Sequence, residues 1–335
     1  MISTRICILY SELNNQTIYT MSVAATLEKE IARLYQVGKT PVPYMSTIST
    51  DTLVTLYLSN KHKIKQPTLE AIRRDYIEYD RLTARQKVLK QPPQFCCHEL
   101  NLYYDKKDNL IHSNRHEYYS ALYWNLRETI DANPGKKIFC LFCITMYMDG
   151  KVDNGHSEVI LYDPALNVLE HVDSNNLPKQ NCRANKGYFD CCQMCISIMT
   201  DISNLLAERP TYVNNNQIYS GYEWGIQSLE ASSDKLTDNE KEGYCLMWAI
   251  LFGDLALSFP EYSVKEIVEI MMKKAGSKRN AETNKNDYLL TVIRGYVATI
   301  SKELGVSFIE EASKHEACVV LAKTFQEDVI KKMCM

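Results

Sequence analysis

Residues 242–251 read EGYCLMWAIL, and the change in texture at Cys245 decides how the middle of the chain folds. Polar and acidic residues precede the cysteine, and an unbroken apolar run follows it. Such a boundary predicts a buried helix that begins at Cys245. The unpaired amides and the macrodipole at a helix start favour a thiolate over a thiol. Cys245 is therefore either an ordinary core cysteine or a nucleophile. The choice depends on whether the chain also supplies a base, a residue that orients it and an oxyanion donor.

The composition is that of a folded, slightly acidic protein. The chain has 335 residues, 45% of them hydrophobic, and a formal net charge of −3. It can bury a sizeable core, as two domains or as one domain with substantial extensions. The charge balance disfavours nucleic acid as a partner. The best apolar run, CLMWAILFGDLAL, is interrupted by Asp254 and is shorter than the roughly 18 to 20 residues of a membrane span. We therefore expect no membrane partner.

The cysteine content points to a reducing compartment. The chain has 12 cysteines, and the apolar block in its first residues, MISTRICILYSELNN, is too short for a secretory signal. Reduced thiols in the cytoplasm are then expected, in place of a disulfide framework. Met21 opens a more ordinary amphipathic segment, so the sequence leaves open whether residues 1–20 belong to the native protein.

The texture of the chain divides it into three parts. Apolar residues at helical spacing predict helices over residues 22–37 and 67–88, after which Pro92-Pro93 breaks the chain. From 95 to 262 we expect strands and helices in alternation, with strands at 137–148, 156–163 and 168–173 and helices at 189–207 and from Cys245. Helical spacing then returns. The prediction is an α+β protein made of an N-terminal helical extension (1–94), a core (95–262) and a C-terminal helical extension (263–335).

A histidine and a carboxylate lie where two predicted strands can bring them together. His156 follows the turn-like Asp153-Asn154-Gly155 and opens one strand, and Asp173 ends the next. Adjacent antiparallel strands can place such ends side by side. Asp173 can then hold His156 in one tautomer and support its charged form. The next candidates for this role are Glu170 and Asp163, with Glu158 last because it stands so close to His156 on the same strand.

The order His156, Asp173, Gln227, Cys245 resembles that of a known group of cysteine peptidases. The blocks GHSEVILYD, LEHVDSNN, GIQSLE and EGYCLMWAILFGDLALSFP are similar to those of the adenovirus-protease and SUMO-protease group (clan CE), and most of all to its divergent members from large DNA viruses. The spacing of 17 residues from His156 to Asp173 is that of the adenovirus enzyme. Ser157 and Leu246 stand where SUMO proteases carry Trp and Gly. Gln227 lies 18 residues before the cysteine, further than in those enzymes.

The resemblance implies both a fold and a set of roles. It implies a small mixed sheet packed against a central helix that begins at Cys245. In that fold His156 would be the base, Asp173 its orienting residue and Gln227 an oxyanion donor beside the amide of Cys245. Gln217, in what looks like a strand or its turn, is the competing glutamine. No cofactor is implied.

Two CxxC pairs, at residues 140–143 and 192–195, raise a competing zinc hypothesis. Side chains three apart on a strand point to opposite faces, which argues against the first pair. The second pair lies in a continuous helical pattern without the glycine turn of a zinc knuckle. Cys96-Cys97-His98 is an equally poor ligand set. We therefore expect core thiols and no metal.

The function that these features predict is a thiol protease that cleaves peptide or isopeptide bonds in a protein substrate. A viral relative would process virion precursors or remove ubiquitin-like modifiers, in the host cytoplasm or the virion. Two alternatives stay open. One is an acyltransferase on the same fold, for which the sequence offers no obvious basic cofactor pocket. The other is an inactive relative that acts as a binding or assembly protein.

Overall fold

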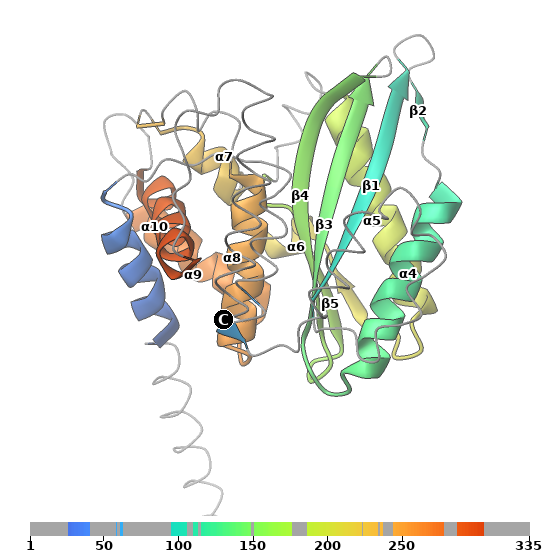
Figure 1. The fold of residues 1–335 in the computed structure, drawn as a ribbon, viewed down its shortest axis with the longest axis horizontal. Helices are drawn as coiled ribbons and strands as arrows, with labels where there is room; N and C mark the ends of the chain where they lie inside the picture. The colour runs from blue at the N-terminus through green and yellow to red at the C-terminus, as the bar shows by residue number, and fades with distance from the viewer. Residues whose placement is uncertain are drawn as a thin grey trace, which may run out of the picture.

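Among the residues that the structure describes, six strands form one mixed sheet with helices on both of its faces (Figure 1). The mixture of helices with a mixed sheet is compatible with the α+β class expected from the sequence. The computed structural model describes residues 26–40, 58, 61–62, 95–105, 110–112, 115–148, 151–175, 186–222, 224–233, 235–236, 244–277 and 287–304.

The sheet has the strand order β2-β1-β3-β4-β5-β6. The pairs β1/β3 and β5/β6 are parallel, and the other neighbours are antiparallel. The central strands β3, β4 and β5 are those that the sequence predicted. The strands are β1 (Phe95–Asp105), β2 (Leu110–His112), β3 (Ile138–Met148), β4 (Lys151–Asp163), β5 (Val168–Val172) and β6 (Thr211–Val213).

The helices begin with a helical segment at residues 26–37, within the predicted N-terminal helix. The helix that begins at Cys245 is α8, and the apolar faces predicted after residue 263 belong to α9 and α10. The labelled helices are α4 (Arg115–Ala132), α5 (Lys186–Leu205), α6 (Asn215–Ile218), α7 (Ile226–Glu230), α8 (Cys245–Ser258), α9 (Val264–Ser277) and α10 (Asp287–Leu304).

Alternate residues of β3 belong to two separate apolar cores. Phe139 and Leu141 join the core that contains α8, α9, α10 and the helical segment at residues 26–37. Ile138, Cys140 and Phe142 join the other core, which contains α4 and α5. This is the period of two that a strand imposes on its side chains. Figure 1 shows the two helical layers on opposite sides of the sheet.

A glycine in α8 lets this helix lie directly on the sheet. Eleven of its residues are buried, from Leu246 to Ala256, as its apolar sequence predicts. A Cβ atom on Gly253 would come within 2.1 Å of the Phe139 ring of β3. Only glycine allows the helix axis to approach the strand this closely, because the ring fills the space that a side chain would take.

The buried carboxylate of Asp254 ties α8 to two distant parts of the chain. Lys61 Nζ donates to Asp254 Oδ2 at 2.8 Å, and His62 Nε2 lies 2.7 Å from Asp254 Oδ1. Tyr296 of α10 donates its hydroxyl to Oδ2 at 3.0 Å. Burial alone would raise the pKa of Asp254, but its hydrogen bonds and the charge of Lys61 outweigh burial and hold that pKa below its ordinary value.

Several expectations need correction or lie outside the described residues. The expected turn at Asp153-Asn154-Gly155 is wrong: these residues lie within β4, at a register shift opposite Met146 and Tyr147 that accommodates one extra residue. Gln217 lies in α6, not in a strand or its turn. The predicted helix at 67–88 and the break at Pro92-Pro93 lie outside the described residues. Among the described helices, none is long and apolar enough to cross a membrane.

Replacing Asp254 with alanine is expected to destabilise the protein by about 3 to 5 kcal/mol, because it leaves Lys61 and His62 beside a buried cavity without their anion. The wild-type contribution should be complete above the ordinary carboxyl pKa and should fade as the pH falls through the lowered one. Chemical unfolding between pH 3 and 7 measures both effects. Glu128→Ala, at an exposed site on α4, is the control and should change stability by less than about 0.5 kcal/mol. Equal stability of the two variants would contradict this role for Asp254.

Candidate active site

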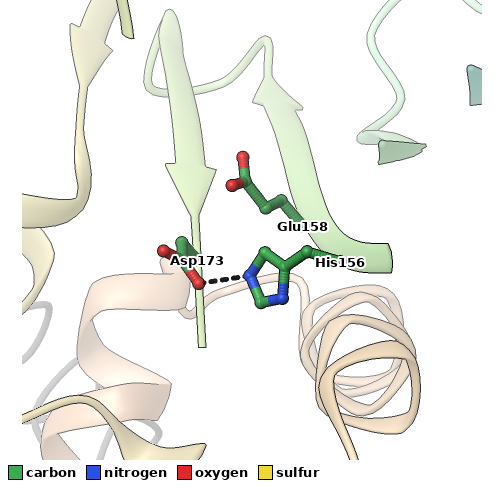
Figure 2. Close-up of side chains that lie close together, drawn as sticks. All are labelled: His156, Glu158 and Asp173. Carbon is green, nitrogen blue, oxygen red and sulfur yellow. Dashed lines mark hydrogen bonds and ion pairs between the residues drawn. The ribbon is translucent and has the colours of Figure 1, made fainter. Parts of the chain in front are cut away.

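His156 and Asp173 meet where β4 and β5 run side by side. The antiparallel ladder pairs Val159 with Val172, so His156 lies diagonally across from Asp173, the residue that follows β5. His156 Nε2 is 2.6 Å from Asp173 Oδ1, and both side chains are buried. Figure 2 shows this contact between the two strands as a dashed line. The structure therefore brings together the histidine and the carboxylate that the sequence paired.

Cys245 reaches the same histidine from the other side, at the first residue of α8. Its thiol is hydrogen-bonded to the imidazole of His156. Because Nε2 is engaged by Asp173, Nδ1 is the ring nitrogen left for the thiol. The backbone amides of Ser157 and Leu246 also donate to the sulfur. Three donors thus converge on a sulfur atom at a helix start, which favours its anionic form.

The electrostatics of the three residues support a thiolate and an imidazolium. Burial opposes the thiolate, but the hydrogen bond and charge of His156 outweigh it, so the pKa of Cys245 lies below its ordinary value. Burial also opposes the imidazolium. The charge and hydrogen bond of Asp173 and the contact with Cys245 overcome that opposition and hold the pKa of His156 well above its ordinary value. Both shifts favour transfer of the proton from the thiol to the imidazole.

Gln227, in the first turn of α7, is bonded to Ser174, the residue that follows Asp173. Its Oε1 accepts a hydrogen bond from Ser174 Oγ at 2.9 Å, and its backbone amide donates to Ser174 O at 2.9 Å. Gly225 makes the approach possible, because a Cβ there would lie 2.5 Å from the carbonyl oxygens of Ser174 and Asn175. Ser228 reinforces the contact by donating to Asn175 O. With its carbonyl fixed, the Nε2 amide of Gln227 stays available as a donor, and no described residue accepts from it.

The competing glutamine, Gln217, is engaged elsewhere. Its Oε1 accepts from the backbone amide of Asn214 at 2.9 Å, and the backbone amide of Gln217 donates to Asn214 Oδ1 at 3.3 Å. The two residues form a capping box at the start of α6, and Gln217 is exposed. This arrangement uses Gln217 to begin a helix.

The alternative carboxylates also have other partners. Glu170 accepts from the backbone amides of Val264 and Lys265 at the start of α9, at 2.8 and 3.1 Å. Burial raises the pKa of Glu170 even though these amides oppose the rise. Asp163 pairs with Lys137 at 2.8 Å. Neither acid is hydrogen-bonded to His156.

Glu158 is the member of the site that the sequence ranked last. The nearest ligand atoms of His156, Glu158 and Asp173 all lie within 4.8 Å of one another, and all three residues are buried. Glu158 Oε2 is in close contact with His171 Nε2, and His171 Nδ1 lies 3.0 Å from the hydroxyl of Tyr212. The sequence did contain a signal for Glu158. Side chains two residues apart on a strand lie on the same face, so residues 156 and 158 share one face of β4.

These three residues are also the group of ligands that could hold a metal ion among the described residues. One imidazole nitrogen and two carboxylates suit Zn²⁺ or a similar cation. Each of the three is already bonded within the protein, His156 to Asp173 and Glu158 to His171. The thiols of Cys140 and Cys195 are buried in the core with α4 and α5, as expected for structural cysteines.

Trp248 connects the site to the interior, one turn after Cys245. It is fully buried and donates from Nε1 to Glu230 Oε2 of α7 at 2.7 Å. The contact ties α8 directly to the helix that carries Gln227.

Comparisons with protein-family models, with curated proteins and with solved structures found no match to this chain.

Iodoacetamide should alkylate Cys245 faster than the other 11 cysteines at neutral pH, because its lowered pKa keeps the thiolate populated below the pH at which ordinary thiols ionise. The advantage should be largest at pH 6 to 7 and should shrink above pH 9, where all thiols ionise. Mass spectrometry after limited alkylation measures the order, and EDTA should leave it unchanged. A Cys245 that ranks among the slowest thiols would contradict the ion pair.

Proposed function

We propose that this protein is a cysteine peptidase in which Cys245 is the nucleophile, His156 the acid and base, and Asp173 the orienting carboxylate. One observation carries the proposal: the imidazole of His156 is bonded on one side to Asp173 and on the other to a thiol of lowered pKa at the start of a buried helix. A structural cysteine needs neither a histidine partner nor an aligned carboxylate.

The reaction follows from the positions of the proton and the charge. The Cys245 thiolate attacks the carbonyl carbon of the substrate, and the oxyanion that forms accepts from the amide of Cys245 and from Gln227 Nε2. His156 gives its proton to the leaving amine, and an acyl-enzyme remains. Neutral His156 then takes a proton from water, which attacks the acyl carbon and releases the acid and the thiolate. Asp173 keeps the imidazole in register throughout.

The substrate class is a peptide or isopeptide bond in a protein, since the sequence resembles peptidases that act on virion precursors or on ubiquitin-like conjugates. A reducing setting such as the host cytoplasm keeps Cys245 as a free thiol. No cofactor is needed, because the three side chains provide the nucleophile and both proton transfers.

Covalent labelling tests this function. The probes are a peptide vinyl sulfone and a ubiquitin-like modifier with a C-terminal vinyl sulfone, and tandem mass spectrometry identifies the modified residue. We expect an adduct on Cys245 that Cys245→Ala abolishes and His156→Gln reduces strongly. Iodoacetamide labelling of Cys245 without any probe adduct would instead favour an inactive relative that binds proteins. Transfer of the acyl group to an added amine or alcohol in place of water would favour an acyltransferase.

Gln227→Ala is expected to lower turnover by about 10² to 10³, the usual effect of losing one oxyanion donor. The Michaelis constant should change much less, because the donor acts mainly on the transition state. Gln217→Ala is the matched control: it removes a capping interaction and should cost only about 1 kcal/mol of stability, with near-normal turnover. The reverse pattern would transfer the role to Gln217.

A further inference from the structure

Two acid–imidazole pairs cross the gap between β4 and β5 in opposite directions. The register pairs Val159 with Val172, and continuing it by one residue sets Glu158 directly opposite Asp173. Like charges directly opposite each other destabilise a sheet. Each carboxylate is bonded diagonally instead, Asp173 to His156 and Glu158 to His171. The result is an alternating array of two acids and two imidazoles.

The array is enclosed by protein. Glu158 and His171 are 1% and 3% exposed, so water screens their charges poorly. The ring of Phe142 packs edge-on against His171, at 6.4 Å between ring centres, and adds an apolar wall. The hydroxyl of Tyr212 can either donate to His171 Nδ1 or accept from it. The pair can therefore stay hydrogen-bonded in either protonation state of His171.

We propose that Glu158 is a positioning residue for the reaction: it acts as a second counter-charge to the imidazolium of His156, and His171 holds it in place. Its carboxylate lies within 4.8 Å of ligand atoms of both His156 and Asp173. Figure 2 shows the three side chains close together. Of the two acids, Asp173 is the one that is hydrogen-bonded to His156. Glu158 contributes charge without direct contact, and so supports the protonated imidazole that the thiolate requires. This role rests on the proposed function.

Among the described residues, other titratable groups face these two acid–imidazole pairs. Cys245 approaches His156 from α8, and Tyr219, after α6, is fully buried near Asp173. Tyr212 approaches His171 from β6. Burial and the charges of Glu158 or Asp173 raise the pKa values of both tyrosines, so these phenols stay neutral across the working range. The two tyrosines therefore add no charge beside the two carboxylates.

The test is a histidine NMR titration of the full chain. Glu158→Gln keeps the shape of the side chain and an acceptor for His171 but removes the charge. It should lower the titration midpoint of His156 by about one pH unit, and Asp173→Asn should lower it further. The basic limb of turnover should move to lower pH by the same amount, with little change in the Michaelis constant. Glu170→Gln, an equally buried glutamate on β5 that caps α9, is the matched control and should leave the midpoint unchanged.

An unchanged His156 midpoint in folded Glu158→Gln would overturn the role. Should that variant fail to fold, the wild-type protein provides the second measurement. Coupled sites titrate in more than one step, so the curves of His156 and His171 should each show an inflection at the midpoint of the other. Two independent single-step curves would overturn the role as well. A shifted midpoint in a protein whose Cys245 takes no probe would instead reject the peptidase and keep the charge pairing.

Discussion

The contact of α8 with the sheet is the constraint on which the site depends. The sulfur belongs to the helix and the imidazole to β4, so the bond between them exists only while the helix lies at one depth and one angle. Gly253 against Phe139 sets the depth, and the buried residues along the helix fix the angle. Asp254 holds the middle of the helix to Lys61, His62 and Tyr296. A helix anchored along its length can present its first residue to a partner without adjustment.

Burying charge is the second constraint, because an isolated carboxylate inside a protein is strongly destabilising. In this chain each of the buried acids has at least one polar partner. Asp254 has a lysine and a histidine, Glu170 has the free amides at the start of α9, and Glu230 accepts from the indole of Trp248. Asp173 and Glu158 have one imidazole each. Of these partners, only the imidazole of His156 also contacts a thiol, that of Cys245.

The elements that were predicted correctly are those whose signal lies within one short stretch of sequence. The change in texture at Cys245 gave the start of α8, alternation gave β3 to β5, and helical spacing gave α9 and α10. The pairing of His156 with Asp173 followed from strand order. β1 was missed because its parallel pairing with β3 joins distant segments, and the turn-like residues before His156 proved to be a bulge. The role of Gln217 was readable as a capping box, since Asn214 stands three residues before it. The Glu158–His171 pair could be predicted only from the register of β4 against β5, and the sequence of one strand alone does not specify that register.

The donors of the proposed oxyanion site come from two different elements, and this raises the question of what keeps them together. The amide of Cys245 moves with α8, whereas Gln227 is fastened through Ser174 to the end of β5. The Trp248–Glu230 hydrogen bond links these two elements, since it joins α8 to α7 inside the core. The contacts then form a ring: α8 to α7 through Trp248, α7 to β5 through Ser174, β5 to β4 through Asp173, and β4 back to α8 through His156. In such a ring no member can shift without straining the others, so thiol, imidazole and both donors keep one relative position even though they come from three separate segments of the chain.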